Sequence, residues 1–392
     1  MIIHPVEISS ALGRCRVSAT IEIETPGRVF PKTGTRTQEL WIDWPESYLK
    51  PTEARPDGFV IMCLTLAMCL GERLQVRGAM SQSLVLNLLE AMAIYKHYFL
   101  GLCEIVDLDA EGEFRPRGAS ARVGSFYSGG VDSLYNIAES ARLHREFGTL
   151  PITDLWLIQG MDIALDQDDL WEKTKSTIFA QLPAGHDMIC ADIRTNVRDL
   201  HYKIVDWEKL GFSVVLGGIS KVFAPIVPNV LIGSYAKYDK IVPHASSPLV
   251  DPMWSCDEQS VRHFSCRASR QDKIETVATH APYLLQGLRV CHKNTGGAYN
   301  CGVCEKCMRT QAQLIIGGYQ QLADTFDTEL SSKTLRRLKL PWRWENRFTW
   351  DFWRDIQAGF RERGETDLDH ALSHVFRKYT VKRAVRRCLG GR

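Results

Sequence analysis

The chain has 392 residues, of which 45% are hydrophobic and 24% are charged, and its formal net charge is only +2. This composition is ordinary for a soluble globular protein, and the length suffices for two or three domains. The near-neutral charge gives no bulk attraction to nucleic acid, so such a partner is possible but not favoured. No secretory signal is visible, and the longest apolar run, residues 59–70, is too short to cross a bilayer. We therefore expect a cytoplasmic protein without a membrane partner.

The first 120 residues predict an N-terminal β+α domain without recognisable chemistry. Residues 16–24 and 39–44 alternate between apolar and polar side chains, as half-buried strands do. Residues 57–72 and 82–99 have the apolar spacing of helices. A polar, turn-rich stretch at residues 111–118 marks the expected boundary to the next domain.

From residue 122 onwards, predicted strands alternate with predicted helices. Strands are expected at residues 123–127, 155–159, 188–192 and 230–233, and helices at residues 134–147, 168–182 and 197–224. This alternation predicts an α/β domain over residues 121–320, with a doubly wound parallel sheet. Ligands of such sheets bind beyond the carboxyl ends of the strands. The groups expected to meet there are Ser128–Ser133, Gln159, Gly160, Asp192, Gly233 and Ser234.

The segment Ser128-Gly129-Gly130-Val131-Asp132-Ser133 has the chemistry of an anion site. It joins a predicted strand to a predicted helix, so the N–H groups of the turn and the helix dipole can face a bound anion. Glycine leaves room for a phosphate oxygen, the serines add hydroxyl donors, and Asp132 can hold a magnesium-bound water. The Gly-Lys-Ser/Thr ending of a Walker loop is absent.

Four of the twelve cysteines lie close together in the sequence: Cys291, Cys301, Cys304 and Cys307. Two successive Cys-x2-Cys spacings let thiolates reach one tetrahedral ion, and a longer loop adds the first cysteine. We therefore predict a closed, structural zinc site, with an iron–sulfur cluster as the alternative. Cys266 and His292 are further candidate ligands.

The Ser-Gly-Gly-x-Asp-Ser pattern at residues 128–133 resembles the pyrophosphate loop of the ATP pyrophosphatase superfamily. The four-cysteine motif follows the strands and helices of the α/β domain in the sequence. With both the loop pattern and this motif, the chain is similar to the 7-cyano-7-deazaguanine synthases. The resemblance covers residues 122–318, about half of the chain. The substrate-loop residues of those enzymes, Asp-x-Arg-Pro-Glu, have no counterpart here. The resemblance implies cleavage of ATP between its α and β phosphates, with AMP left on a carboxyl, carbonyl or amide oxygen.

An ATP-dependent ligase that forms a C–N bond is the function that the resemblance implies. ATP and Mg²⁺ would bind at residues 128–133, a carboxylate or amide oxygen would be adenylated, and a nitrogen nucleophile would displace AMP. The substrate would be a small molecule or a modified base, as in 7-deazaguanine chemistry, or a protein. A tRNA-modifying thiolase of the same superfamily and a non-catalytic nucleotide-binding subunit are the alternatives. A homodimer is also compatible with the sequence.

Each predicted site residue has a role in this scheme. The nucleotide is expected at Ser128, Gly129, Gly130, Val131, Asp132, Ser133, Gln159, Gly160, Gly233 and Ser234. Asp132 and Ser133 are also candidate catalytic residues, and the basic candidates for neutralising the α-phosphate are Lys221, Arg270 and Lys273. The irregular stretch at residues 238–252 predicts a substrate loop, or else a surface crossover. Its candidate residues are His244, Ser247 and Asp251.

Residues 321–392 predict a helical C-terminal extension. Aromatic packing is expected from Trp342, Trp344, Trp350 and Trp353. Residues 377–392 carry seven basic side chains and no acidic one. A basic helix of this kind can bind RNA or an acidic partner, and a solvated amphipathic face is the alternative.

Overall fold

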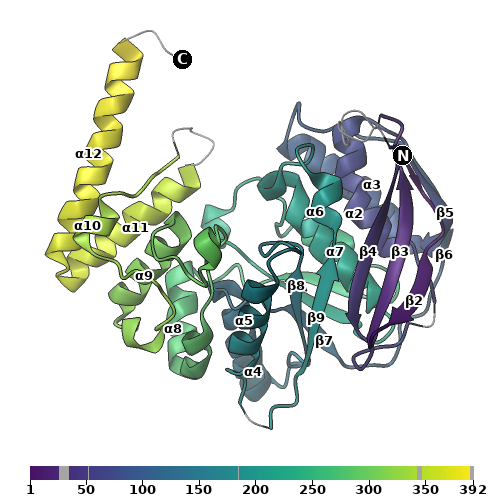
Figure 1. Ribbon diagram of the computed structural model, residues 1–392, viewed down its shortest axis with the longest axis horizontal. Helices are drawn as coiled ribbons and strands as arrows, with labels where there is room; N and C mark the ends of the chain where they lie inside the picture. Colours follow the sequence, from purple (N-terminus) through teal and green to yellow (C-terminus); the bar gives the residue numbers. More distant parts are fainter. Residues whose placement is uncertain (26–34, 52, 184, 342–346, 389–392) are drawn as a thin grey trace. The chain divides into compact units, whose positions relative to one another are not determined.

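The computed structural model describes residues 1–25, 35–51, 53–183, 185–341 and 347–388. The chain forms two compact units, whose elements are labelled in Figure 1. The first unit comprises Met1–Ser128, Asp132–Trp171 and Pro183–Arg270, and the second comprises Gly129–Val131, Glu172–Leu182 and Gln271–Arg392. This division differs from the expected boundaries near residues 120 and 320. The N-terminal region belongs with most of the α/β segment, and the cysteine motif belongs with the C-terminal helices.

All eleven strands found in the described residues belong to one mixed, mostly parallel sheet in the first unit. The strand order is β11-β10-β7-β8-β9-β4-β3-β1-β5-β6, and β2 pairs with β3 beside this path. The strands are β1 (Ile2–Ile3), β2 (Glu7–Ala11), β3 (Arg14–Glu22), β4 (Thr37–Pro45), β5 (Leu74–Ser81), β6 (Leu108–Glu113), β7 (Val123–Phe126), β8 (Asp154–Gln159), β9 (Ile189–Thr195), β10 (Asn229–Gly233) and β11 (Ser260–Phe264).

The strands β7 to β11 are parallel to one another and form the α/β part of this sheet. Their spatial order is β9-β8-β7-β10-β11. After β7, the chain adds β8 and then β9 on one side of β7, and later adds β10 and β11 on its other side. The direction in which strands are added therefore reverses beside β7. The connecting helices are α4 (Val131–Phe147), α5 (Asp168–Phe179), α6 (Val197–His201) and α7 (Phe212–Val222), and α8 (Arg270–His280) follows β11. The four predicted strands and the helices between them are confirmed, with ends that differ by a few residues.

The N-terminal strands extend the α/β sheet instead of forming a sheet of their own. β4 pairs with β9 in antiparallel fashion. Arg14 of β3 reinforces this junction, because its guanidinium donates to the carboxylates of Asp43 and Asp192 over 2.9 Å each. Asp192, expected near the ligand, is therefore part of the junction. The helices of this region are α2 (Asp57–Leu70) and α3 (Gln82–Tyr98).

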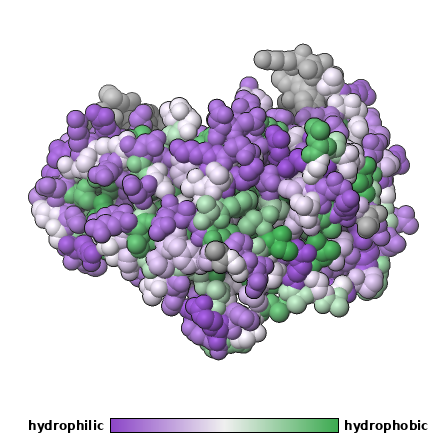
Figure 2. Space-filling model, turned by 60° about the horizontal axis from the view of Figure 1, so that its bottom comes forward, coloured by the Kyte–Doolittle hydropathy of each residue, from purple (hydrophilic) through white to green (hydrophobic). Residues whose placement is uncertain are grey.

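The first unit has a continuous hydrophobic core that spans both of its sequence regions. All but one of the residues of α2 are buried, and they share this core with residues of α7 and of the strands β8, β9 and β10. Some apolar side chains remain outside it: Leu86 and Leu89 of α3 are 64% and 47% exposed. Figure 2 shows hydrophobic residues in scattered groups among hydrophilic ones on one face of the protein. Among the residues that the structure describes, no helix combines the length and hydrophobicity needed to cross a bilayer.

The second unit is helical and has its own core. Its main helices are α9 (Glu305–Gly317), α10 (Ser332–Leu335), α11 (Arg347–Arg363) and α12 (Thr366–Cys388), the last drawn in yellow in Figure 1. Trp353, Phe360 and Leu372 are fully buried in this core, and Trp350 packs against it. Helices α10, α11 and α12 lie within residues 321–392, where helices are predicted. Trp342 and Trp344 lie outside the described residues.

Candidate functional site

The segment Ser128–Ser133 joins a strand to a helix, as predicted. β7 ends at Phe126 and α4 begins at Val131, so the first turn of α4 carries Asp132. Gly129 has a φ of 74°, which L-residues with a side chain rarely adopt. A Cβ at this position would lie 2.8 Å from Cγ2 of Ile178. Both the backbone conformation and the lack of space therefore require glycine.

Within the second unit, the turn is held by the segment that leads into the cysteine motif. The backbone N–H of Arg289 donates to the carbonyl oxygen of Gly129 over 2.9 Å. The Arg289 side chain is almost completely buried, and its Nη2 donates to Asn294 over 2.8 Å. Lys273 of α8 is also buried in this unit. The sequence analysis did not single out Arg289. Its position two residues before Cys291 was the feature that could have drawn attention to it.

Within the first unit, Asp132 and Arg270 form an ion pair. Nη1 of Arg270 lies 3.2 Å from Oδ2 of Asp132, and the two side chains are 10% and 33% exposed. Gly233, at the end of β10, closely approaches the start of α4: a Cβ there would lie 3.4 Å from the main-chain oxygen of Asp132. Ser234 donates its N–H to Phe264 at the end of β11 over 3.0 Å. The structure thus brings Asp132, Arg270 and Gly233 together at the carboxyl edge of the sheet.

Gln159 and Gly160 shape the loop that follows β8. Gly160 has a φ of 96°, and a Cβ there would overlap the carbonyl oxygen of Thr195. The Gln159 side chain is fully buried, and its Nε2 donates to the carbonyl oxygen of Ala164 over 3.2 Å. Because this side chain serves its own loop, a nucleotide at this position would meet mainly backbone.

Lys221 lies at the opposite edge of the sheet. It belongs to the last turn of α7, and its Nζ donates to Oε1 of Gln259, directly before β11, over 2.6 Å. Since β7 and β11 run in the same direction, the start of β11 and the end of β7 are at opposite edges. The structure therefore does not bring Lys221 to Asp132. Burial lowers the pKa of Lys221.

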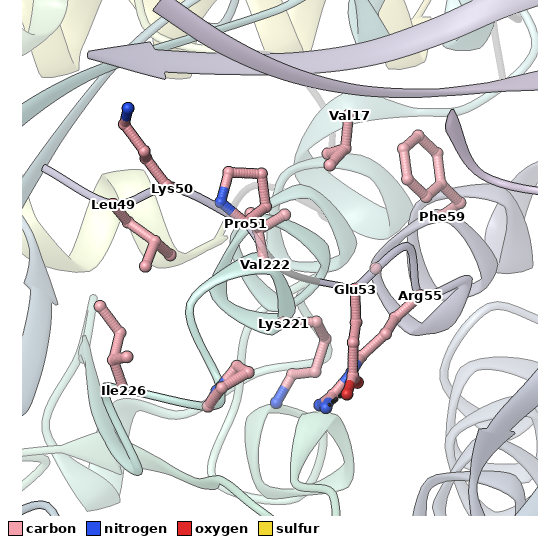
Figure 3. A pocket seen from close by; sticks show the side chains of 12 residues that line it. Val17, Leu49, Lys50, Pro51, Glu53, Arg55, Phe59, Lys221, Val222 and Ile226 are labelled. Atoms are coloured by element: carbon pink, nitrogen blue, oxygen red, sulfur yellow. Dashed lines mark hydrogen bonds and ion pairs between the residues drawn. The ribbon is translucent and has the colours of Figure 1, made fainter. Parts of the chain in front are cut away.

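A cavity of about 150 Å³ adjoins Lys221. Figure 3 shows the side chains that line it, among them Phe59 and Val222, with the charged groups of Glu53 and Arg55 near that of Lys221. Arg55 is paired with both Glu53 and Glu258, so the charges here are largely compensated.

Two of the predicted substrate residues mainly shape their own loop. Ser247 is fully buried, and its hydroxyl accepts the N–H of Val250 over 3.2 Å. His244 is half-buried and packs against Tyr235, with ring centroids 4.2 Å apart. Burial lowers the pKa of His244.

The third predicted substrate residue, Asp251, is the centre of a buried polar network. Ser213 and Ser246 each donate a hydroxyl hydrogen bond to its carboxylate over 2.6 Å. Nδ1 of His263 lies 2.6 Å from Oδ2 of the same carboxylate, and both side chains are at most 1% exposed. Asp251 is thus fully occupied by protein groups, and sequence reasoning missed its partner His263.

The four clustered cysteines bring their sulfurs together in the second unit. The Sγ of Cys291 lies 3.6 Å from that of Cys301 and 4.0 Å from that of Cys304, and Cys301 and Cys307 are 3.9 Å apart. All four sulfurs lie within 4.8 Å of one another. A tetrahedron with metal–sulfur bonds of about 2.3 Å has edges of about 3.8 Å. The cluster could therefore hold a single metal ion such as zinc. Cys266 and His292 are not part of it.

The backbone around the cysteines is well supported. The side-chain oxygen of Asn300 accepts the N–H groups of Val290 and Cys291 over 2.8 and 3.1 Å. Cys304 caps α9, because its sulfur accepts the N–H of Cys307. Without a metal, hydrogen bonds from Cys304 and Cys307 lower the pKa of Cys291. A thiolate at Cys291 is the form that a divalent cation binds.

Comparisons of the chain with protein-family models, with curated proteins and with solved structures find no match. Function is therefore inferred from the segment Ser128–Ser133 with its ion pair, and from the cysteine cluster.

Proposed function

We propose that this protein is an ATP-dependent ligase of the ATP pyrophosphatase type, similar to the 7-cyano-7-deazaguanine synthases. It would adenylate a carboxylate or amide oxygen with release of pyrophosphate, and a nitrogen nucleophile would then displace AMP. One observation carries the proposal: Ser128–Ser133 follows β7, beside which the strand order reverses, and leads directly into α4. In doubly wound sheets this reversal is where ligands bind, and the positive end of a helix dipole favours phosphate.

The side chains around the turn match the charge changes of this reaction. The turn amides and the α4 dipole would stabilise the pyrophosphate as it leaves. Ser128 and Ser133 would add hydroxyl donors. Asp132 is the residue that would hold Mg²⁺, which neutralises phosphate charge. Arg270 now pairs with Asp132, and it would turn to a phosphate oxygen when the carboxylate is engaged.

The cysteine cluster would have a structural role in this enzyme. Four thiolates complete the coordination of a zinc ion and leave no open position for water. A zinc ion at Cys291 would fix the segment that holds Arg289 against Gly129. The acceptor would be a carboxylate of a small molecule or modified base, and ammonia or an amine would be the nucleophile.

Pyrophosphate release from ATP, with Mg²⁺ and a panel of small carboxylates, tests the proposal. We expect Asp132→Asn to lower the rate by about 100-fold or more, as for the loss of other transition-state charge contacts. The matched control is Asp169→Asn, because Asp169 also lies in the first turn of a helix and is exposed. Its rate should stay within about twofold of wild type. Equal rates for the two variants, or no pyrophosphate from wild type, would contradict the proposal.

A further inference from the structure

The second unit contains a larger cavity than the one beside Lys221. Its volume is about 550 Å³, which lies within the range of sites that enclose small molecules. One wall is a face of α9, and the other wall is formed by residues of the segment 320–330. Every residue that lines the cavity belongs to the second unit, so the site does not depend on the first.

Much of the cavity wall is apolar. Leu314 of α9 is 1% exposed, and the side chains of Ile315, Phe326 and Leu330 are half-buried. Apolar side chains that water still reaches are stabilised when another apolar group covers them. The cavity therefore suits a ligand with an apolar body.

The charge of the cavity has one sign. Among the described residues that line it, the ionisable ones are Asp324 and Glu329, and both are acidic. Neither carboxylate forms an ion pair or a side-chain hydrogen bond within the ranges that the structure describes. In the cavity beside Lys221, by contrast, Arg55 offsets the charge of Glu53. The larger cavity thus carries two negative charges that attract a cation.

Hydrogen bonds hold the segment 320–330 against α9. The side chain of Gln311 is 8% exposed, and its Oε1 accepts the N–H of Leu330 over 2.8 Å. Its Nε2 donates to the carbonyl oxygen of Thr328 over 3.2 Å. The cavity is therefore formed by the protein alone, and a ligand does not have to order its own site.

The cysteine motif supports the same wall from the other side. The N–H of Asp327 donates to the carbonyl oxygen of Asn300 over 2.9 Å. Gly302 has a φ of 71°, and a Cβ there would overlap the carbonyl oxygen of Thr328. The segment that carries the cysteines therefore also positions the wall with the two carboxylates.

We propose that this cavity binds an organic cation, in which a protonated amine is attached to an apolar group. The ammonium group lies against the two carboxylates, and the apolar group lies against the leucine, isoleucine and phenylalanine side chains. Gln320 and Gln321 also line the cavity, and amide oxygens accept hydrogen bonds from an ammonium group. The inference does not rest on the proposed ligase function, because no residue of Ser128–Ser133 lines this cavity.

Binding of 2-phenylethylamine tests the proposal, with 2-phenylethanol as a neutral probe of nearly the same shape. In ligand-observed NMR titrations of the full chain at pH 7, the amine should bind at least about fivefold more tightly than the alcohol, since each partly exposed ion pair adds a modest attraction. This preference should shrink as the salt concentration rises. Equal affinities, or no binding of the amine, would overturn the proposal.

Removal of the two carboxylates should abolish the preference for the amine. The double variant Asp324→Asn, Glu329→Gln should bind the amine no more tightly than the alcohol and should bind the alcohol within about twofold of wild type. The matched control is Glu362→Gln with Asp367→Asn, which removes two exposed carboxylates of the second unit that do not line the cavity. An undiminished amine affinity in the first variant, or the same loss in the control, would contradict the assignment.

Two further measurements fix the place of binding. Phe326→Ala should weaken both probes by about fivefold and keep the preference for the amine, because it removes apolar contact and no charge. In wild type, the amine should slow hydrogen exchange of the amides at residues 320–330 and leave those of α2 unchanged. This readout does not depend on how a variant folds, and protection elsewhere in the chain in place of residues 320–330 would reject the cavity as the site.

Discussion

The cysteine cluster and Cys256 place the same side chain in two different surroundings. In the cluster each sulfur faces other sulfurs at 3.6 to 4.0 Å, a spacing that suits one tetrahedral ion. Cys256 instead faces the amine of Lys221, with Nζ and Sγ 3.9 Å apart, and it belongs to no group of potential metal ligands in the described residues. Cys304 of the cluster and Cys256 are both partly buried, so exposure does not distinguish the two surroundings. The neighbours of a thiol therefore decide what it can bind: three further thiols complete a site for one metal ion, and a single amine does not.

Removal of one cluster thiol should have the largest effect. We expect Cys307→Ser to abolish zinc binding and to destabilise the second unit by about 3 kcal/mol or more, since a structural metal contributes its binding energy to folding. Metal analysis should fall from one zinc per chain to near zero, and thermal unfolding should begin earlier. Cys190→Ser is the control and should keep the metal. If Cys307→Ser retained zinc, or if iron were found instead, the assignment of the cluster would be wrong.

Metal removal should separate the two thiol environments. In zinc-loaded protein the four cluster cysteines should resist iodoacetamide, because coordinated thiolates are protected. After chelation their labelling should rise by about tenfold or more. The labelling rate of Cys256 should change by less than about twofold, since its neighbour is the amine of Lys221. A comparable rise at Cys256 would show that its reactivity depends on the metal, and the contrast would fail.

The ion pair of His263 should give stability a distinct pH dependence. Its pKa is about 9 in the folded chain and 6.5 in the unfolded chain, so the folded protein binds an extra proton between these values. This stabilisation is complete below pH 6.5 and is lost as the pH rises through 9. We expect wild type to lose on the order of 2 kcal/mol more than His263→Asn between pH 6.5 and 9.5, measured by urea unfolding.

His201 provides the matched control for this measurement. Burial lowers its pKa to about 4, so its unfolded form gains the proton first and stability falls as the pH drops from 6.5 towards 4. His201→Gln should therefore change only the acid side of the profile. An alkaline side that is the same in wild type and His263→Asn would contradict the charged state assigned to His263.

The pairing of Lys221 with Cys256 should have the smallest effect on activity. Their Nζ and Sγ atoms are 3.9 Å apart, but the amine is engaged by Gln259 at the amino edge of the sheet. We expect Lys221→Met to leave pyrophosphate release within about twofold of wild type, and to cost about 1 kcal/mol of stability because Gln259 loses its donor. Loss of most of the activity would bring Lys221 back as a catalytic residue.

Features that depend on short sequence spacing could be predicted from the sequence. The turn at Ser128–Ser133 was recognisable because glycines between an apolar strand and a helix leave few other conformations. The cysteine cluster was recognisable because its last three ligands lie within seven residues, from Cys301 to Cys307. The strands β7, β8, β9 and β10 were found because buried parallel strands are short apolar runs.

Features that depend on distant pairing could not be predicted in this way. β5 and β6 were missed because polar residues interrupt their alternation, and their pairing with β1 and with each other stabilises them. β11 has the sequence Ser-Val-Arg-His-Phe, and only its register beside β10 makes it a strand. The substrate roles expected of Ser247 and Asp251 came from their presence in a long loop, but the structure buries both.

The junction between β4 and β9 has a consequence for how the chain can be divided. β9 would be an edge strand without β4, and its N–H and C=O groups near Thr195 and Arg194 would lack the partners that Ile42 and Asp43 supply. Exposed edges of this kind recruit strands from other molecules and lead to aggregation. A chain shortened to residues 121–392 would also uncover the apolar face that α2 covers. Removal of the first 120 residues should therefore yield insoluble protein, even though the segment Ser128–Ser133 and the cysteine cluster are retained.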